Sequence, residues 1–333
     1  MSSQNRRAAL KAAAATAVFA LSGIMPQVAA AQEAASFPSG PVTMVVPFPP
    51  GGATDNLARV VANRLSEKWG KPVLVDNRSG GSGMIGAELV ARAKPDGHTI
   101  MHTLSTLIQA PHLYPSLKLE PLKAFETISM SATNGLLLVV HDQVPAHSLE
   151  DLVKLARAEP EKYSYGSYGV GTTGHLYGYM FNSQSNLNMV HVGYRGEAPS
   201  VVDLLGHQIP MVIMSGNGAK AHLQTGKMRA IAATGSERSL VAPDTPTFTE
   251  LGYKNMDLNG WYGFFAPAGT PKPIVDKIST DINEVLADPE VKANFRAIDI
   301  KLLGTTPEVF AEQMNSDYEK WGKIIREAGV TAE

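Results

Sequence analysis

The 333-residue sequence contains no cysteine. This absence excludes disulfide bonds, a cysteine nucleophile and the lipid anchor that bacterial lipoproteins attach through cysteine. The fold must therefore take its stability from a packed core, for which the chain is long enough.

The sequence also has no large excess of charge of either sign and few long apolar runs. The formal net charge is −2, and no basic cluster follows the first residues, so nucleic acid is not an expected partner. Beyond the N-terminal segment, no apolar run approaches the roughly 20 residues that span a bilayer. We therefore expect the mature product to diffuse freely.

The N-terminal segment has the features of an export signal. An apolar, Ala-rich stretch covers residues 12–24, and small residues at 29–31 offer a cleavage site after Ala31. The positive charges before it come from Arg6, Arg7 and Lys11. Residues 1–31 are therefore predicted to be a signal peptide that directs the protein to the periplasm. Adjacent arginines leave both the general secretory and the twin-arginine route open.

Strand and helix patterns alternate from residue 42 onward. Buried strands are predicted by the apolar runs at 42–48, 73–76 and 99–103. Residues 55–69 and 84–93 have the spacing of amphipathic helices. This β-α-β-α-β order predicts a sheet of parallel strands with helices on its faces.

A second series of elements begins near residue 136. Strands are expected at 136–141, 163–166, 189–194, 209–214 and 228–233, with helices at 148–159 and 198–205 between them. A strand at 263–267 and helices at 271–286 and 307–327 follow. We predict an α/β protein of two lobes, each a mainly parallel sheet flanked by helices. Lobe 1 would comprise 38–135 and 264–333, and lobe 2 would comprise 136–263.

The first candidate binding segment lies where strand 42–48 ends and helix 55–69 begins. Ligands of open α/β sheets bind at this edge, and free N–H groups at a helix start favour an anion. Glycines allow close approach of the backbone. The alternative is an ordinary helix cap. The predicted contacts are Phe48, Gly51, Gly52, Ala53, Thr54 and Asp55.

The second candidate segment has the same placement in lobe 2: strand, Gly-rich turn, hydroxyl groups, helix. Its glycine spacing differs from the dinucleotide-binding pattern, and no phosphate-binding lysine follows, so a carboxylate suits it better than a pyrophosphate. A purely structural turn is the alternative. The predicted contacts are Ser167, Gly169, Gly171, Thr172, Thr173 and His175.

Four further polar residues follow strands at the same edges, namely Thr103, Ser105, Tyr194 and Ser215. Turn capping is their alternative role. His98 and His102 are four residues apart but flank a strand, so they do not predict a metal site. No nucleophile motif is present either. We therefore expect a binding protein that is not an enzyme and that needs no cofactor or metal.

Together, several segments resemble the tripartite tricarboxylate transporter receptors, also called the Bug family of extracytoplasmic solute receptors. The matching stretches cover most of the mature chain. They include 45–48 with Gly51, Gly52 and Asp55; 75–78 with Gly80, Gly81 and Gly86; 95–97 with Thr99; Gly166, Ser167, Gly169, Gly171, Thr172, His175 and Leu176; 190–192 with Tyr194, Gly196, Ala198 and Pro199; 203–206; Pro243, Asp244, Pro246 and Thr247; and Trp261, Gly263 and 265–271.

The resemblance implies a Venus-flytrap fold in which the loop 50–55 holds one ligand carboxylate and the Gly-rich turn holds the other end. It implies a small di- or tricarboxylate ligand and delivery to integral membrane transporter subunits. We also expect a monomer. Some members of the family instead serve sensor kinases, and others bind aromatic carboxylates or acidic amino acids. Ser215 stands where the family often has an acid, so a natural partner for a ligand amine is missing. We therefore expect a ligand without an amine.

Overall fold

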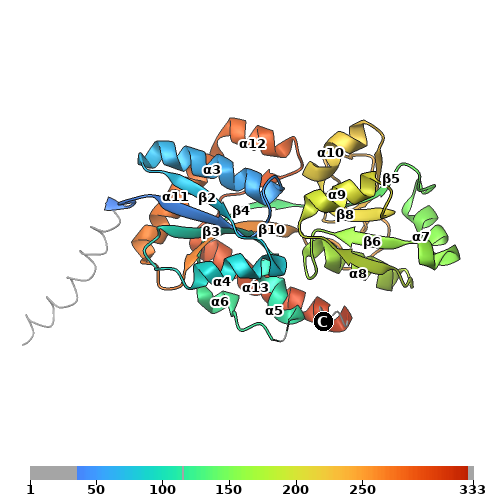
Figure 1. The fold of residues 1–333 in the computed structure, drawn as a ribbon, viewed down its shortest axis with the longest axis horizontal. Helices are drawn as coiled ribbons and strands as arrows, with labels where there is room; N and C mark the ends of the chain where they lie inside the picture. Colours follow the sequence, from blue (N-terminus) through green and yellow to red (C-terminus); the bar gives the residue numbers. More distant parts are fainter. Residues whose placement is uncertain (1–35, 115, 329–333) are drawn as a thin grey trace, which may run out of the picture.

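The computed structural model describes residues 36–114 and 116–328, which form two α/β lobes side by side (Figure 1). The predicted signal peptide lies outside the described residues. The strands are β1 (Val42–Val46), β2 (Val73–Asn77), β3 (Thr99–Leu104), β4 (Phe125–Asn134), β5 (Leu136–His141), β6 (Ser164–Ser167), β7 (Val190–Gly193), β8 (Met211–Ser215), β9 (Met228–Ala233), β10 (Gly260–Pro267) and β11 (Lys301–Leu302).

Helices flank both sheets. They are α3 (Ala53–Trp69), α4 (Met84–Ala91), α5 (Thr106–Leu113), α6 (Pro121–Ala124), α7 (Leu149–Ala158), α8 (Thr173–Gln184), α9 (Glu197–Leu205), α10 (Gly216–Gln224), α11 (Lys272–Ala287), α12 (Pro289–Arg296) and α13 (Pro307–Ala328). Short 3-10 turns η1 (Gly81–Gly83) and η2 (Pro160–Lys162) complete the set.

The first lobe is built on a six-stranded sheet with the order β11-β4-β10-β3-β1-β2. Strands β3, β1 and β2 are parallel, which confirms the predicted β-α-β-α-β unit. Helix α3 buries Leu57, Val61 and Leu65 against this sheet, as its apolar spacing predicts. The ten-residue strand β4 was not predicted, although its alternation of apolar residues with Thr and Ser is typical of a strand.

The second lobe contains a five-stranded sheet with the order β7-β6-β8-β5-β9. The predicted cap at Ser148 is confirmed: its hydroxyl accepts a hydrogen bond from the N–H of Asp151 at 3.1 Å and starts α7.

The prediction that each sheet is mainly parallel is wrong, since both sheets are mixed. The antiparallel pairs arise because one strand of each sheet enters its lobe directly from the other lobe. Strands β5 and β10 both begin at the boundary between the lobes and run away from it. Their neighbours β3, β4, β8 and β9 end there, so every pair that includes β5 or β10 is antiparallel.

The chain passes between the lobes at two well-defined places. Gly135 alone separates β4 from β5, and an added Cβ there would lie 2.6 Å from the Thr234 carbonyl oxygen. Strand β10 returns the chain to the first sheet and begins at Gly260, so the predicted lobe boundary at residue 263 falls inside a strand. Strands β1 to β4 with β10 and β11 form the first sheet, and β5 to β9 form the second.

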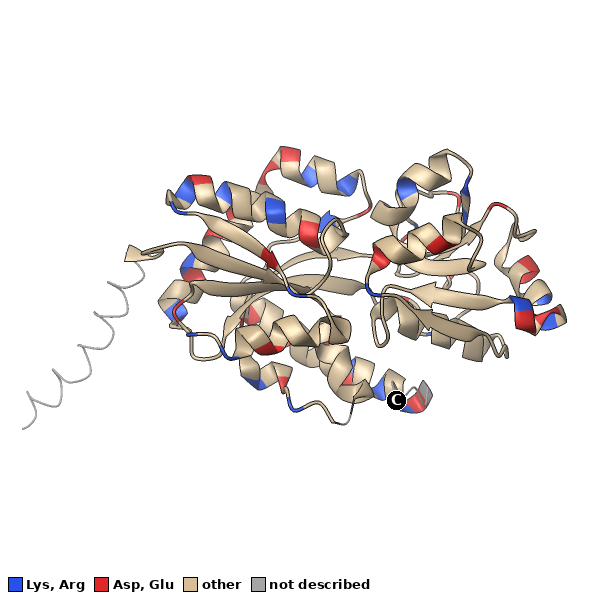
Figure 2. Cartoon of the chain, in the orientation of Figure 1, with Lys and Arg blue, Asp and Glu red and all other residues tan. Residues whose placement is uncertain are grey.

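The C-terminal helix α13 spans both lobes. It packs on α5 of the first lobe and α8 of the second (Figure 1). At α8, the Trp321 and Tyr177 rings meet edge to face at 5.8 Å between centroids. On the outer helices, Lys and Arg are interspersed with Asp and Glu (Figure 2). Several of these charges form i, i+4 pairs, such as Arg92 with Glu88.

Candidate functional site

A pocket opens between the lobes, at the ends of the strands that meet there. Its walls come from both sheets, from the first turns of surrounding helices and from the two crossing segments. The residues that line it are Phe48, Pro49, Pro50, Gly52, Ala53, Thr54, Asp55, Leu104, Ser105, Asn134, Leu136, Tyr168, Thr173, Gly196, Glu197, Ala198, Ser215, Gly260, Trp261 and Tyr262.

Five helices begin at this pocket. Their first or capping residues all belong to its lining: Gly52 for α3, Ser105 for α5, Thr173 for α8, Gly196 for α9 and Ser215 for α10. A helix N-terminus presents unpaired N–H groups and a partial positive charge. No Lys, Arg or His lines the pocket within the described residues. An anion would therefore be held here by neutral donors and helix ends.

The loop before α3 is held in place by Asp55. Its carboxylate accepts hydrogen bonds from the Gly51 N–H at 2.9 Å, Arg59 Nε at 2.8 Å and Asn77 Nδ2 at 2.9 Å. Burial opposes the charged form, but these hydrogen bonds outweigh it and hold the pKa of Asp55 below its usual range. Gly51 has a φ of +90°, which favours glycine. The N-cap Gly52 offers no side-chain acceptor, so the first N–H groups of α3 remain for a ligand.

Replacing Asp55 by alanine is expected to destabilise the protein and loosen this loop. The change removes the acceptor of the Gly51 N–H and one of the two acceptors of the Asn77 amide, which also donates to the Phe48 carbonyl. It should lower the free energy of unfolding by about 2–3 kcal/mol. Urea denaturation measures this loss. Asp55→Asn keeps the shape and part of the bonding, so it should cost less. Equal stability of Asp55→Ala and wild type would contradict the role given to Asp55.

The two lobes touch beside the pocket through Thr173. Its hydroxyl oxygen lies 3.2 Å from Ser105 Oγ and accepts a hydrogen bond from Gln109 Nε2 at 3.0 Å. The Tyr168 hydroxyl accepts from the Gly174 N–H at 3.3 Å, and burial raises the pKa of this phenol, which keeps it protonated. The lobe-2 wall of the pocket is thus lined by neutral hydroxyl groups.

Two buried donors in the pocket lining lack a hydrogen-bond partner among the described residues. They are Nε1 of Trp261, in the returning strand β10, and Nδ2 of Asn134, at the end of β4. Trp261 is 3% exposed and Asn134 is 8% exposed. An unmade hydrogen bond of a buried donor costs free energy, so these groups favour a ligand with acceptor atoms between the lobes.

Eight of the sequence-predicted contacts line the pocket, namely Phe48, Gly52, Ala53, Thr54, Asp55, Ser105, Thr173 and Ser215. The structure places the other eight outside its lining: Gly51, Thr103, Ser167, Gly169, Gly171, Thr172, His175 and Tyr194. Residues of both groups lie near strand ends, so this position alone did not predict which of them line the pocket. The direction of each side chain within its turn decides this, and the sequence pattern does not show that direction.

Most residues of the second group have internal partners instead. Thr172 donates to the Gly169 carbonyl at 2.7 Å and caps α8. His175 Nδ1 accepts from the Gly171 N–H at 3.0 Å, and burial lowers the pKa of His175 to about 4. The Tyr194 hydroxyl donates to Asp203 at 2.9 Å. These residues shape the Gly-rich turn that carries Thr173 to the pocket.

The rest of the lining includes residues from distant parts of the chain that the sequence analysis did not predict. Trp261 and Tyr262 come from the returning strand, Asn134 and Leu136 from the other crossing, and Glu197 from the first turn of α9. Asn134-Gly135 between two apolar strands is the one local signal that could have indicated a crossing.

His102 and His98 have separate surroundings. His102 is fully buried, with Nδ1 3.1 Å from the Thr54 carbonyl oxygen and Nε2 3.0 Å from Ser131 Oγ. His98 lies 3.1 Å from Ser39 Oγ. His102 therefore contacts the backbone of the first turn of α3 from within the core.

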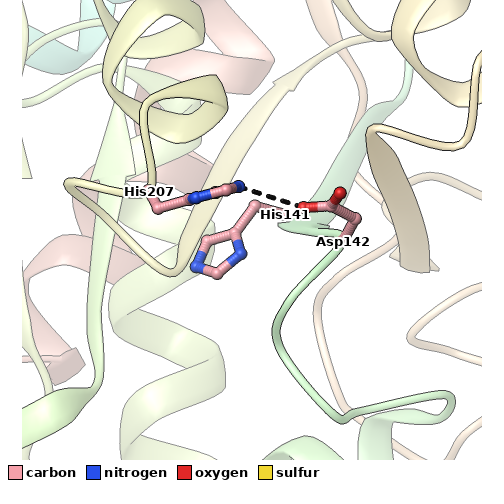
Figure 3. Close-up of side chains that lie close together, drawn as sticks. All are labelled: His141, Asp142 and His207. Carbon is pink, nitrogen blue, oxygen red and sulfur yellow. Dashed lines mark hydrogen bonds and ion pairs between the residues drawn. The ribbon is translucent and has the colours of Figure 1, made fainter.

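A group of potential metal ligands lies away from the pocket, at the far end of β5. His141, Asp142 and His207 have ligand atoms within 4.8 Å of one another, and His207 Nε2 lies 3.0 Å from an Asp142 carboxylate oxygen (Figure 3). This contact ties the end of β5 to the turn after α9.

Comparison with known proteins identifies the family. The family model described as "Tripartite tricarboxylate transporter family receptor" matches residues 57–330. The chain belongs to this receptor family. BugT of Bordetella pertussis is 32% identical to the receptor over 305 residues, which cover 91% of this chain and 94% of BugT.

Solved structures agree with this assignment. The periplasmic binding protein BugD has 33% sequence identity and a TM-score of 0.84, over 89% of this chain and 99% of BugD. The R. palustris protein Rpa4515, solved with adipate, has 32% identity and a TM-score of 0.84 over 89% of this chain and 99% of its own. The receptor therefore has the two-lobed periplasmic binding protein fold predicted from its sequence. Within the described residues, no helix combines the length and apolar character that a membrane crossing needs.

Proposed function

We propose that the receptor captures a small carboxylate in the pocket between its lobes and delivers it to a membrane transporter. The observation that carries this proposal is the uncapped first turn of α3, which opens on a pocket where four other helices also begin and where no described residue is cationic. Helix ends and neutral donors stabilise a carboxylate there. The relative solved with adipate supports the carboxylate class. Di- and tricarboxylates are the first candidates, with aromatic carboxylates and acidic amino acids as alternatives.

We further propose that the receptor binds without chemical conversion of its ligand, acts as a monomer, and works in the periplasm after removal of residues 1–31. The family is one of receptors, which supports binding over catalysis. Recovery of unchanged ligand after prolonged incubation, measured by mass spectrometry, tests the first point. Mass spectrometry of the exported chain tests cleavage after Ala31.

A thermal-shift screen of residues 32–333 against mono-, di- and tricarboxylates, aromatic acids and amino acids tests the function. A ligand present at 100 times its dissociation constant should add about 2.7 kcal/mol to the free energy of unfolding. A clear shift with one carboxylate class supports the receptor. No shift with any carboxylate, from folded and ligand-free protein, would refute the proposal.

A sensory role is the second candidate, since receptors can report ligand to a sensor kinase instead of a transporter. Deletion of the gene separates the two roles. Loss of ligand uptake supports transport, whereas intact uptake with loss of a ligand-dependent transcriptional response supports sensing.

A further inference from the structure

One carboxylate of the protein itself already lies in the pocket. Glu197, the first residue of α9, accepts a hydrogen bond from the Ser215 N–H at 2.8 Å through one oxygen. Its other oxygen accepts from the Ser215 hydroxyl at 2.8 Å. The Ser215 hydroxyl in turn accepts from the Gly218 N–H at 3.2 Å. Glu197 therefore occupies the N-terminus of α10, the anion position nearest to it.

The backbone around Glu197 leaves room for its carboxylate. An added Cβ at Gly218 would lie 2.1 Å from a carboxylate oxygen of Glu197. Glycine at this position thus lets the carboxylate approach the first turn of α10 closely.

The charge of Glu197 has no cationic partner. No Lys, Arg or His lies within ion-pair distance of its carboxylate in the part of the chain that the structure describes. Although the residue keeps some accessible surface toward the pocket, its carboxyl lies deep between the lobes, and burial raises the pKa of Glu197 despite the Ser215 hydrogen bonds. A buried carboxylate without a counter-charge is costly, so a cationic ligand group would relieve it.

The rest of the pocket favours an anionic ligand group, whereas Glu197 favours a cationic one. The first turn of α3 offers unpaired N–H groups beside Gly52, and the Trp261 and Asn134 donors lack acceptors. The other acid in the lining, Asp55, is already bonded to Arg59 and Asn77. The pocket therefore has donors without acceptors toward lobe 1 and the crossing strands. In lobe 2 it has one carboxylate, Glu197, that is hydrogen-bonded by Ser215 but has no cationic partner among the described residues.

We propose that Glu197 is a specificity-determining residue that binds the ammonium group of the ligand, so that the receptor selects amine-bearing carboxylates over simple dicarboxylates. This inference rests on the proposed carboxylate-binding function. It reverses the sequence-based expectation of a ligand without an amine. That expectation rested on the missing acid at position 215, but Glu197 brings a carboxylate to Ser215 from a neighbouring helix.

Matched ligand pairs test the preference by isothermal titration calorimetry on the mature chain. In one series an ammonium replaces the second carboxylate at equal chain length: succinate with 3-aminopropanoate, glutarate with 4-aminobutanoate, and adipate with 5-aminopentanoate. In a further pair, malate and aspartate, an ammonium replaces a hydroxyl. We expect the amine member of at least one pair to bind at least tenfold more tightly.

Variants at Glu197 test its role. Glu197→Gln should weaken the preferred amine at least tenfold and change the affinity for its amine-free partner less than threefold. Glu197→Asp keeps the charge and should keep the preference. Ser215→Ala removes one support of the carboxylate but not its charge, so it should retain the preference. Thermal melts establish that each variant is folded.

The outcomes separate the inference from the function on which it rests. If wild type binds the amine-free member of every pair equally well or better, or if Glu197→Gln retains the preference, Glu197 is not an ammonium site. If Glu197→Gln weakens all ligands alike, Glu197 only caps α10, and the inference again fails. If no carboxylate of either kind binds to wild type, the proposed receptor function itself fails.

Discussion

Gly52→Phe is expected to abolish ligand binding and leave the fold intact. Gly52 is the N-cap of α3, has an ordinary extended conformation (φ −79°, ψ 171°) and lines the pocket. A Cβ at this position would meet no atom within 4 Å. The backbone therefore accepts a side chain, while the aromatic ring would fill pocket space and cover the N–H groups of the first turn.

We expect the dissociation constant to rise at least 100-fold, a loss of about 2.7 kcal/mol in binding free energy, with a melting temperature within a few degrees of wild type. Calorimetry with the carboxylate that gives the largest thermal shift measures the effect. Gly40→Phe is the matched control: a Cβ there also meets nothing within 4 Å, but Gly40 does not line the pocket. Retained affinity in Gly52→Phe would place the ligand elsewhere.

Acid should destabilise the receptor well above the pH at which carboxylates titrate, and His102 should account for much of this loss. Burial lowers the pKa of His102 to about 3, against the hydrogen bond to Thr54, which raises it. In the unfolded chain the pKa is near 6.5, so below that pH the unfolded state binds a proton that the folded state excludes. Stability is therefore intact above pH 6.5 and falls as the pH drops toward 3.

Between pH 7 and pH 5, His102 alone should remove about 2 kcal/mol from the free energy of unfolding. His191 and His175, whose pKa values burial lowers to about 3 and about 4, act in the same direction. Urea denaturation across this range should show that His102→Gln, although less stable at pH 7, loses about 2 kcal/mol less than wild type.

His147→Asn, which removes an exposed histidine instead of a buried one, is the matched control. An unaltered slope in His102→Gln would show that His102 is protonated in the folded protein at pH 5. Its contacts with Thr54 and Ser131 would then have to rearrange on protonation.

Much of this receptor could be predicted from local sequence. The apolar runs and helical spacings placed β1, α3, β5 and β9 within a few residues of their positions, because burial of an apolar face decides such elements locally. The Pro-Gly-Gly loop before α3 was found for the same reason, since glycine, an N-terminal helix turn and a preceding strand all lie within ten residues.

Only the tertiary structure decided which of the predicted residues meet. In the Gly-rich turn of lobe 2, Thr173 lines the pocket, whereas the hydroxyl of its neighbour Thr172 bonds the Gly169 carbonyl and caps α8. The two side chains point in different directions, which the sequence pattern does not predict. The mixed sheets follow from where β5 and β10 enter the lobes, and this depends on long-range pairing.

The sequence by itself determined two α/β lobes, an anion-favouring helix start in lobe 1 and a chain without disulfides. The tertiary structure decided the charge of the pocket. Glu197, Trp261 and Asn134 are distant in sequence and belong to three different segments, yet they line one space. The interaction of a buried charge or donor depends on what surrounds it in three dimensions. Donors without acceptors and the Glu197 carboxylate without a counter-charge therefore face one pocket only when both lobes are folded together.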